Sequence, residues 1–405
     1  MTDVARESVA SALEQAPVVS HLNPLPSYDL ADHPVPTGRE EVWRFTPIKR
    51  LRGILDGEPS DARLEWDTSV PEGIEISTIT AEQARELGEL PPNERPAALA
   101  VARSGGAALI DVPAELAPGE PLVIRLTGAS VDDLVWGHLV FRIGNHADVT
   151  IVLLHSGSAR YCATTSFLVG DGARVNVVSL QDWADDAVHL GRDAIRVGRD
   201  ASVKHTSVSF GGDVVRMHAN VEYAAPGGEA ELLGLYFADA GQHLEHRLFA
   251  DHNQPRTKSN VAYKGALQGQ GAHTVWIGNV LIRKVAEGIE TYEENRNLVL
   301  TDGCQADSVP NLEIETGEIA GAGHASATAR LDDEQLFYLR SRGVSDVEAR
   351  RLVLHGFFND LIRKVGVPSL EGRLTQTVEV ELAKTVLAGV PLGASLILPV
   401  EEVAD

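Results

Sequence analysis

Few residues in this chain have the type and spacing needed to bind a metal ion. Its two cysteines, Cys162 and Cys304, are too far apart for a Cys-x-x-Cys site and too few for the disulfide framework of a secreted protein. A chain that holds a metal–sulfur cluster by itself normally supplies about four thiolates. This chain therefore cannot hold such a cluster alone.

The histidines are scattered along the sequence. The closest pair, His243 and His246, occurs in the segment HLEH, and residues three apart on a strand point to opposite faces. A metal ion shared by these two is not expected. His324, in AGAGHASAT, is a further candidate. A lone imidazole binds metal weakly without a second ligand, and a histidine satisfied by hydrogen bonds on a strand is the more common case.

Signatures of nucleotide-binding and hydrolytic enzymes do not occur in the sequence. It contains no G-x-x-x-x-G-K-(S/T) phosphate loop and no G-x-S-x-G nucleophile elbow. We therefore expect no nucleotide site, no resident cofactor and no enzymatic activity.

Charge and hydropathy exclude other classes of partner. Acidic residues outnumber basic ones 58 to 35, and no run of Lys and Arg provides the basic patch that nucleic acid or anionic lipid requires. The start, MTDVARESVASALEQAP, lacks the basic and apolar regions of a signal peptide, and no stretch resembles a membrane span of about 20 apolar residues. We expect a cytoplasmic protein without nucleic-acid or membrane partners.

An internal repeat predicts the elements that would position these residues. The pattern Gly-x-x-Ala-x-(Val/Leu) starts at Gly144, Gly170, Gly198 and Gly227, with a looser copy at Gly269, and each copy leads into a short strand. Short strands at a regular spacing of this length are typical of stacked coils. We predict a mainly β protein built on a right-handed parallel β-helix, with a β-sandwich as the alternative. Glycine would allow the φ of a tight corner, and alanine would fit inside.

Helical patterns flank the repeats. We predict helices over 4–15 and 81–87 before them, and three more after them: 332–342, a second one capped by Ser345 and Glu348, and a third that includes Leu370 and Val386. The expected organisation is a mostly helical amino-terminal cap over 1–97, a β-helix over 98–330 and a helical region over 331–405.

Four segments resemble the SufB/SufD family of iron–sulfur cluster assembly scaffolds, and the SufD branch in particular. They occur along this chain in the order in which the family has them. They are GREEVWRFTP from Gly38, the run from His252 through Ser259 to YKG, ENRNLVL from Glu294, and the block PNLEI, His324 and LDDEQLFYLRSRG. The resemblance implies a β-helix between helical segments and a non-catalytic subunit of a complex with SufB and the ABC-type ATPase SufC. A cysteine desulfurase and its sulfur carrier are indirect partners, and whether the isolated chain forms a homodimer is left open.

The resemblance also implies a metal site. Many relatives have a Cys-x-His pair where this chain has Ala322 and His324. We expect His324 to complete a transient iron or iron–sulfur site with ligands from SufB, and Cys304 to be a weaker candidate, since a single Cys on a strand is more often a small buried hydrophobe. Cys162 is expected in the core.

Two partner surfaces are implied as well. Strand addition at the late coils would form the SufB interface, with the residues Pro310, Asn311, Leu312, Glu313 and Ile314. The carboxyl-terminal helices would bind SufC, with the residues Tyr338, Arg340, Arg342, Phe357, Phe358 and Leu361. Phe357 and Phe358 point about 100 degrees apart on a helix, so one would face the partner unless both are core.

Two other functions remain open at this point. The chain could be a purely architectural subunit that binds no iron, as the alanine at position 322 favours. A more distant alternative is a β-helix polysaccharide lyase or hydrolase, which would need clustered carboxylates along a groove and an export signal.

Overall fold

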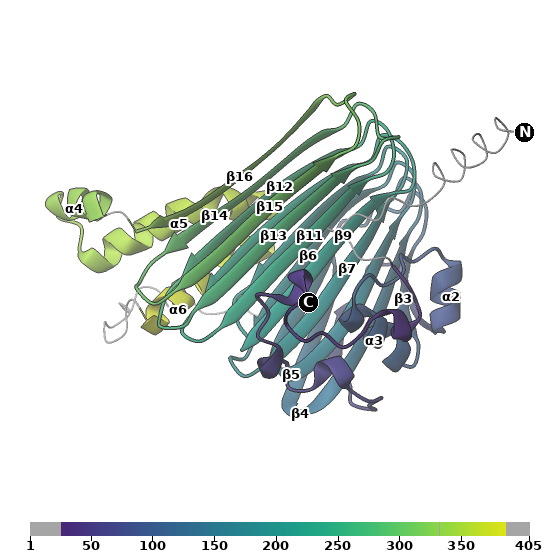
Figure 1. Ribbon diagram of the computed structural model, residues 1–405, viewed down its shortest axis with the longest axis horizontal. Coiled ribbons are helices and arrows are strands. Elements are labelled where there is room, and N and C mark those ends of the chain that lie inside the picture. Colours follow the sequence, from purple (N-terminus) through teal and green to yellow (C-terminus); the bar gives the residue numbers. More distant parts are fainter. Residues whose placement is uncertain (1–25, 332, 386–405) are drawn as a thin grey trace, which may run out of the picture.

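The computed structural model describes residues 26–331 and 333–385. Its centre is one continuous sheet of 16 strands that winds into a parallel β-solenoid of about 8 turns, with helices before and after it (Figure 1). The expected parallel β-helix with helical segments at both ends is confirmed.

Each turn contributes one strand to each of two facing sheets. In order, the first sheet contains β5 (Asp148–Val169), β7 (Val188–Val197), β9 (Val214–Tyr223), β11 (His243–His252), β13 (His273–Ile282) and β15 (Gln305–Ile314). The second contains β6 (Arg174–Trp183), β8 (Ser202–Ser209), β10 (Glu229–Ala238), β12 (Lys258–Leu267), β14 (Glu290–Val299) and β16 (Gly321–Arg330). We call them the odd sheet and the even sheet. Because neighbouring strands are parallel and in register, equivalent residues of successive turns stack on one another.

The solenoid is closed at one end. The strands β4 (Leu122–Ile143) and β5 are each 22 residues long, bend through both sheets and pair along most of their length. Three short strands complete this end: β1 (Glu65–Ser69) and β3 (Ala107–Val112) pair with β4, and β2 (Glu75–Ile79) pairs with β3. At the other end, β15 and β16 have no further strand beside them within the described residues.

The repeated Gly and Ala occupy the corners, but the glycines serve two purposes. The alanines are buried in the solenoid core, as expected. Gly227 and Gly269 have the positive φ expected of a tight corner. Gly170 and Gly198 do not; a Cβ at Gly198 would instead lie 2.7 Å from the main chain of Gly170, so close packing of coils requires glycine there. The looser copy at Gly269 precedes an odd-sheet strand, at the opposite corner from Gly227.

The amino-terminal segment covers the outer face of the odd sheet. From residue 26 on it contains four short 3-10 helices, namely η1 (Leu30–Asp32), η2 (Glu41–Trp43), η3 (Ile48–Leu51) and η4 (Ile54–Asp56), and the α-helices α2 (Ala81–Glu86) and α3 (Arg95–Arg103). Trp43, Leu51 and Leu99 pack against Leu190 and Val214 of this sheet. Since β1 and β2 also lie here, the segment is mixed rather than mostly helical. The proposed boundary at residue 97 falls within α3, and the helix expected over 4–15 lies outside the described residues.

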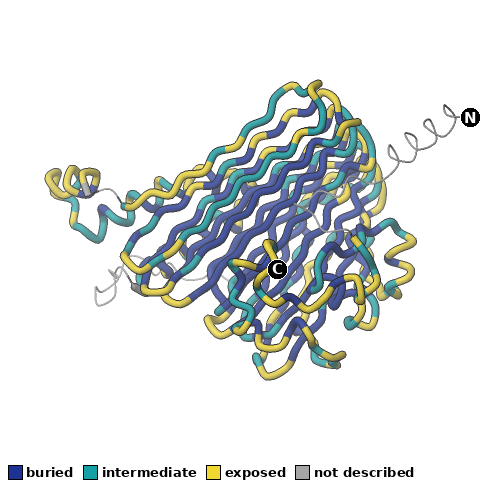
Figure 2. Tube along the Cα trace, viewed as in Figure 1, coloured by how far each residue is buried: buried dark blue, intermediate teal, exposed yellow. Residues whose placement is uncertain are grey.

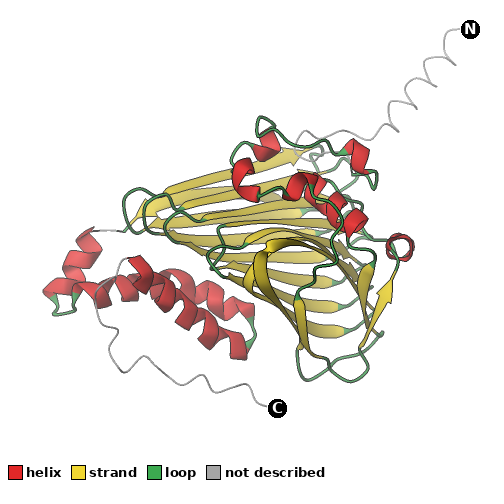
Figure 3. Cartoon of the chain, turned by 90° about the horizontal axis from the view of Figure 1, so that it is seen from below, coloured by secondary structure: helices red, strands yellow, loops and turns green. Residues whose placement is uncertain are grey.

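The carboxyl-terminal helices cover the even sheet. They are α4 (Asp333–Ser341), α5 (Asp346–Val365) and α6 (Pro368–Thr385). Leu354, Phe358 and Leu374 pack on the outer face of this sheet, so the two groups of helices lie on opposite sides of the solenoid (Figure 3). Ser345 accepts a hydrogen bond from the Glu348 N–H, as the predicted cap requires. No helix among the described residues is long and apolar enough to cross a membrane.

Candidate functional site

The open end of the solenoid exposes two unpaired strand edges. Most strands are buried along their length, whereas the residues of β15 and β16 are half-buried or exposed (Figure 2). The predicted partner-binding residues Pro310 to Ile314 form the second half of β15, and the side chain of Ile314 is exposed. Unpaired N–H and C=O groups on such an edge are free to pair with a strand from another chain.

His324 lies on β16, directly opposite Glu293 of β14. Its Nδ1 is 3.8 Å from Oε1 of Glu293; the His324 side chain is 46% exposed and that of Glu293 only 1%. No side chain of the described residues donates a hydrogen bond to either carboxylate oxygen, and only the main-chain N–H of Asn311 approaches the group. A buried carboxylate with so little hydrogen bonding is costly, so its position requires another explanation.

The surroundings of Glu293 are suited to binding a cation. Burial raises the pKa of Glu293 to about 8, and the main-chain N–H of Asn311 acts in the opposite direction. Gly278 of β13 leaves the necessary space, because a Cβ there would lie 2.3 Å from Oε2 of Glu293. A carboxylate and an imidazole on adjacent turns can each donate to a divalent metal ion such as iron.

The site is incomplete within this chain. Among the residues that the structure describes, no group of three or more His, Cys, Asp or Glu side chains is arranged to hold a metal ion. Ala322 lies two residues before His324, on the same interior-facing row, and is opposite Thr291 of β14. The position at which the family resemblance implies a Cys therefore lies close to His324, but the alanine in this chain cannot act as a ligand there.

The two cysteines are placed away from this pair. Cys304 lies in the turn before β15; its Sγ donates to the main-chain O of Gly269, 3.3 Å away, and packs against the core. Glu293 instead lies near Asn311, in the second half of that strand. Cys162 is fully buried under the amino-terminal cap, as expected for a core residue, and burial raises the pKa of its thiol.

Side chains from two of the resembling segments meet inside the last turns. Asn295 and Asn297 of ENRNLVL hydrogen-bond to the Tyr236 hydroxyl, and Asn295 Nδ2 also reaches the Tyr263 carbonyl. Gly265, in YKG, makes room for the Tyr236 ring, since a Cβ there would lie 1.9 Å from a ring carbon. These polar residues form an ordered interior beneath the open end.

The sequence alone did not lead us to predict Glu293 as a site residue. Glu293 immediately precedes the ENRNLVL segment and shares its strand parity with Asn295 and Asn297. That alternation was the available signal: three polar residues at every second position of one strand must share a face. Only the packing of the solenoid shows that this face is interior.

The residues predicted to bind an ATPase divide into two groups. Tyr338 of α4 is exposed, as are Arg340 and Arg342. Phe358 and Leu361 are instead 0% and 2% exposed, in the cluster between α5 and the even sheet, so they are not available as surface contacts. Phe357 is half-buried beside Lys264, whose Nζ lies 5.3 Å from the ring centroid.

Comparison with known proteins identifies a matching family model and related sequences. The family model described as "SUF system FeS cluster assembly, SufBD core domain" matches residues 125–357. An iron–sulfur cluster assembly SufBD family protein of Mycobacterium bovis is 51% identical over 89% of this chain and 92% of its own length. A Mycobacterium leprae protein with the same description is 48% identical over 89% of this chain and 93% of its own length. A second SufBD family protein of M. leprae is 25% identical over 52% of this chain and 24% of its own length.

The family model covers more than half of the chain, including most of the solenoid and the open end, and two relatives match nearly the whole chain. The chain therefore belongs to the SufB/SufD family of iron–sulfur cluster assembly proteins.

Proposed function

We propose that this chain is a SufD-like, non-catalytic scaffold subunit that works in the cytoplasm in a complex with SufB and SufC. The observation that carries the proposal is the Glu293–His324 pair at an open solenoid end: it supplies two metal ligands and needs a second chain for the rest. Iron, or a nascent cluster, is the cargo of such a site rather than a resident cofactor.

The second chain is proposed to be SufB. Its late coils would pair with β15 and β16, through the edge from Pro310 to Ile314 and the strand that carries His324. Such an interface would bury on the order of 2,000 Å² or more, as permanent complexes do. M. leprae contains at least two SufBD family proteins, one 48% and the other 25% identical to this chain over the matched residues, and this supports pairing between two family members.

The proposed division of ligands follows from what this chain lacks. It offers an imidazole at His324 and a carboxylate at Glu293 but no thiolate beside them. SufB would supply the thiolate, and the cysteine desulfurase with its sulfur carrier would supply sulfide. In the absence of SufB, the same edges would pair two copies of this chain as a homodimer.

The SufC-binding surface is proposed on α4 and the start of α5. Phe337 and Tyr338 are 72% and 58% exposed, and Leu352 adds a further exposed apolar side chain. Arg340 and Arg342 of the earlier prediction lie beside them. Phe358 and Leu361 would act by anchoring α5 to the even sheet instead of touching the ATPase.

The first test is purification of the tagged chain from its own cells under anaerobic conditions. We expect a related β-solenoid protein and an ABC-type ATPase to co-elute. A chain that elutes alone, after gentle lysis and at native expression levels, would contradict the complex.

The second test measures iron bound by the intact complex carrying His324→Ala or Glu293→Gln, with His146→Asn as the control. His146 is an exposed histidine at a coil corner, and Asn tolerates its positive φ. We expect at least a tenfold loss of bound iron for the first two variants and none for the control. Unchanged iron in all three would favour the purely architectural subunit, which the alanine at position 322 also supports.

A further inference from the structure

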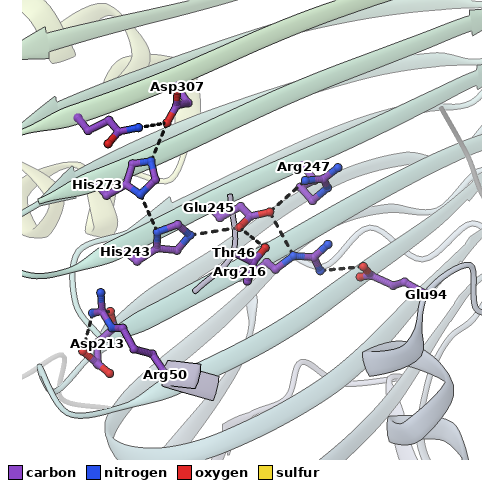
Figure 4. Close-up of polar contacts among 11 residues, drawn as sticks. Thr46, Arg50, Glu94, Asp213, Arg216, His243, Glu245, Arg247, His273 and Asp307 are labelled. Atoms are coloured by element: carbon purple, nitrogen blue, oxygen red, sulfur yellow. Dashed lines mark hydrogen bonds and ion pairs between the residues drawn. The ribbon is translucent and has the colours of Figure 1, made fainter. Parts of the chain in front are cut away.

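Two histidines from adjacent turns face each other on the outer side of the odd sheet. His243 and His273 are the first residues of β11 and β13 and are paired in register. Their Nδ1 atoms are 3.2 Å apart, and the rings are inclined by 76° with centroids 4.8 Å apart (Figure 4). Neither residue belongs to the pair formed by Glu293 and His324, whose side chains point into the solenoid.

The Nε2 atom of each ring, which is the nitrogen remote from the other histidine, contacts a carboxylate. His243 Nε2 is 3.1 Å from Oε2 of Glu245, and His273 Nε2 is 2.7 Å from Oδ2 of Asp307. A carboxylate accepts hydrogen bonds, so each Nε2 carries a proton, and a ring with a single proton then has its lone pair on Nδ1. Two such lone pairs on nitrogens 3.2 Å apart repel each other unless a cation bridges them.

The distance between the two Nδ1 atoms suits a metal ion. With metal–nitrogen bonds of about 2.0–2.1 Å, a separation of 3.2 Å gives an angle of about 100° at the metal, near the tetrahedral value. For a proton shared by two rings, the same separation lies at the long end of the hydrogen-bond range of roughly 2.7–3.2 Å. A carboxylate on the remote nitrogen is also the usual support of a metal-binding histidine.

The support for one ring is rigid. Glu245 is fully buried and accepts hydrogen bonds from Thr46 Oγ1 at 2.8 Å, Arg216 Nε at 3.2 Å and Arg247 at 3.1 Å (Figure 4). Trp43 covers the Arg216 guanidinium at 4.2 Å. The amino-terminal cap therefore fixes the carboxylate that orients His243, and a pre-oriented ligand loses less entropy when it binds.

The other ring is partly exposed to solvent. The side chains of His273 and Asp307 are 22% and 26% exposed, whereas those of His243 and Glu245 are 1% and 0% exposed. Gln305 Nε2 donates to the same Asp307 oxygen, 2.7 Å away, and keeps that carboxylate in place on the edge strand. An ion could enter from this side, with water filling its remaining positions.

We propose that His243 and His273 form a two-histidine site for a divalent first-row transition-metal ion, bound between their Nδ1 atoms and oriented by Glu245 and Asp307. The site does not depend on the proposed scaffold function, because all four of its residues come from one chain; Asp307 lies on β15, in the half that precedes Pro310.

The test is isothermal titration of the full chain with Zn²⁺ after treatment with a chelator. We expect one ion per chain that persists in His324→Ala and in the exposed-histidine control His146→Asn. His273→Asn should lower the affinity at least tenfold, and Asp307→Asn about 10- to 100-fold, as carboxylate partners of metal-binding histidines do. Circular dichroism of each variant must match that of the wild type, and Asp307→Asn, on an edge strand, serves if His273→Asn misfolds.

A second measurement is the visible absorption spectrum of the chain with Co²⁺ bound in place of Zn²⁺. Tetrahedral Co²⁺ bands should appear with the wild type and His324→Ala and be lost with His273→Asn. Zinc binding that survives unchanged in both His273→Asn and Asp307→Asn would overturn the proposal. So would a wild-type chain that binds no Zn²⁺ and shows, by nitrogen NMR, a proton shared between the two rings.

Discussion

The buried carboxylate of Glu293 predicts a specific dependence of stability on pH. Its folded-state pKa is about 8, compared with 4.5 for an ordinary glutamate. Between these values the folded chain keeps a proton that the unfolded chain has released, so the free energy of unfolding decreases as pH rises. The stabilisation relative to an ionised carboxylate is fully present at pH values below the pKa of the unfolded state, and it is lost as pH rises through the pKa of the folded state.

The magnitude follows from the size of the shift. Each pKa unit corresponds to about 1.4 kcal/mol, so the contribution of Glu293 should change by about 2 to 3 kcal/mol between pH 5.5 and 7.5. Glu293→Gln cannot ionise and keeps nearly the same volume. The variant should therefore gain stability relative to the wild type as pH rises across this range.

The measurement is urea unfolding of the wild type and Glu293→Gln at pH 5.5, 6.5 and 7.5, followed by circular dichroism. Glu290→Gln is the matched control, because Glu290 is an exposed glutamate at the start of the same strand. A difference between wild type and Glu293→Gln that stays constant across the three pH values would refute the argument that this carboxylate is buried and unpaired.

Three further changes should have distinct effects. Gly265→Ala forces a Cβ against the Tyr236 ring and should destabilise by about 1–3 kcal/mol in urea unfolding, whereas Gly317→Ala, with nothing within 4 Å, should be neutral. Thr46→Val removes a hydrogen bond to the buried carboxylate under the cap and should cost about 1.5–3 kcal/mol, with Thr46→Ser restoring most of it. Phe337→Ser should reduce co-elution of the ATPase without lowering the melting temperature; equal recovery of the ATPase would exclude this surface.

The architecture was predictable because the same physical requirement recurs at every turn. Ala173 and Ala201 are both buried in the core one turn apart, and exposed or half-buried residues alternate with buried ones at the start of β6, the strand that follows Ala173. Each further copy of the repeat supports the same predicted structure, so the prediction does not depend on any single copy. The predicted φ requirement failed at Gly198, because close approach of two main chains and a positive φ both select glycine and cannot be told apart from one sequence.

The parts that were not predictable depend on contacts between distant segments. Phe358 and Leu361 looked suitable for a partner, but whether an apolar helix face meets a sheet or another chain is decided by tertiary packing. The pairing of His243 with His273 was hidden for a similar reason. The two residues are a full turn apart in sequence, and only the register of the solenoid stacks them.

The unequal ends of the solenoid limit how many copies can associate. Within the described residues, β15 and β16 present unpaired edges of 10 residues each, whereas the other terminus is filled by the long bent strands and leaves only the 5-residue edges of β1 and β2 unpaired. Joining two such termini uses the same kind of surface on each molecule and leaves only the short edges of β1 and β2 for a third molecule. Each molecule therefore has one main surface for strand pairing, and we expect it to form closed pairs instead of filaments.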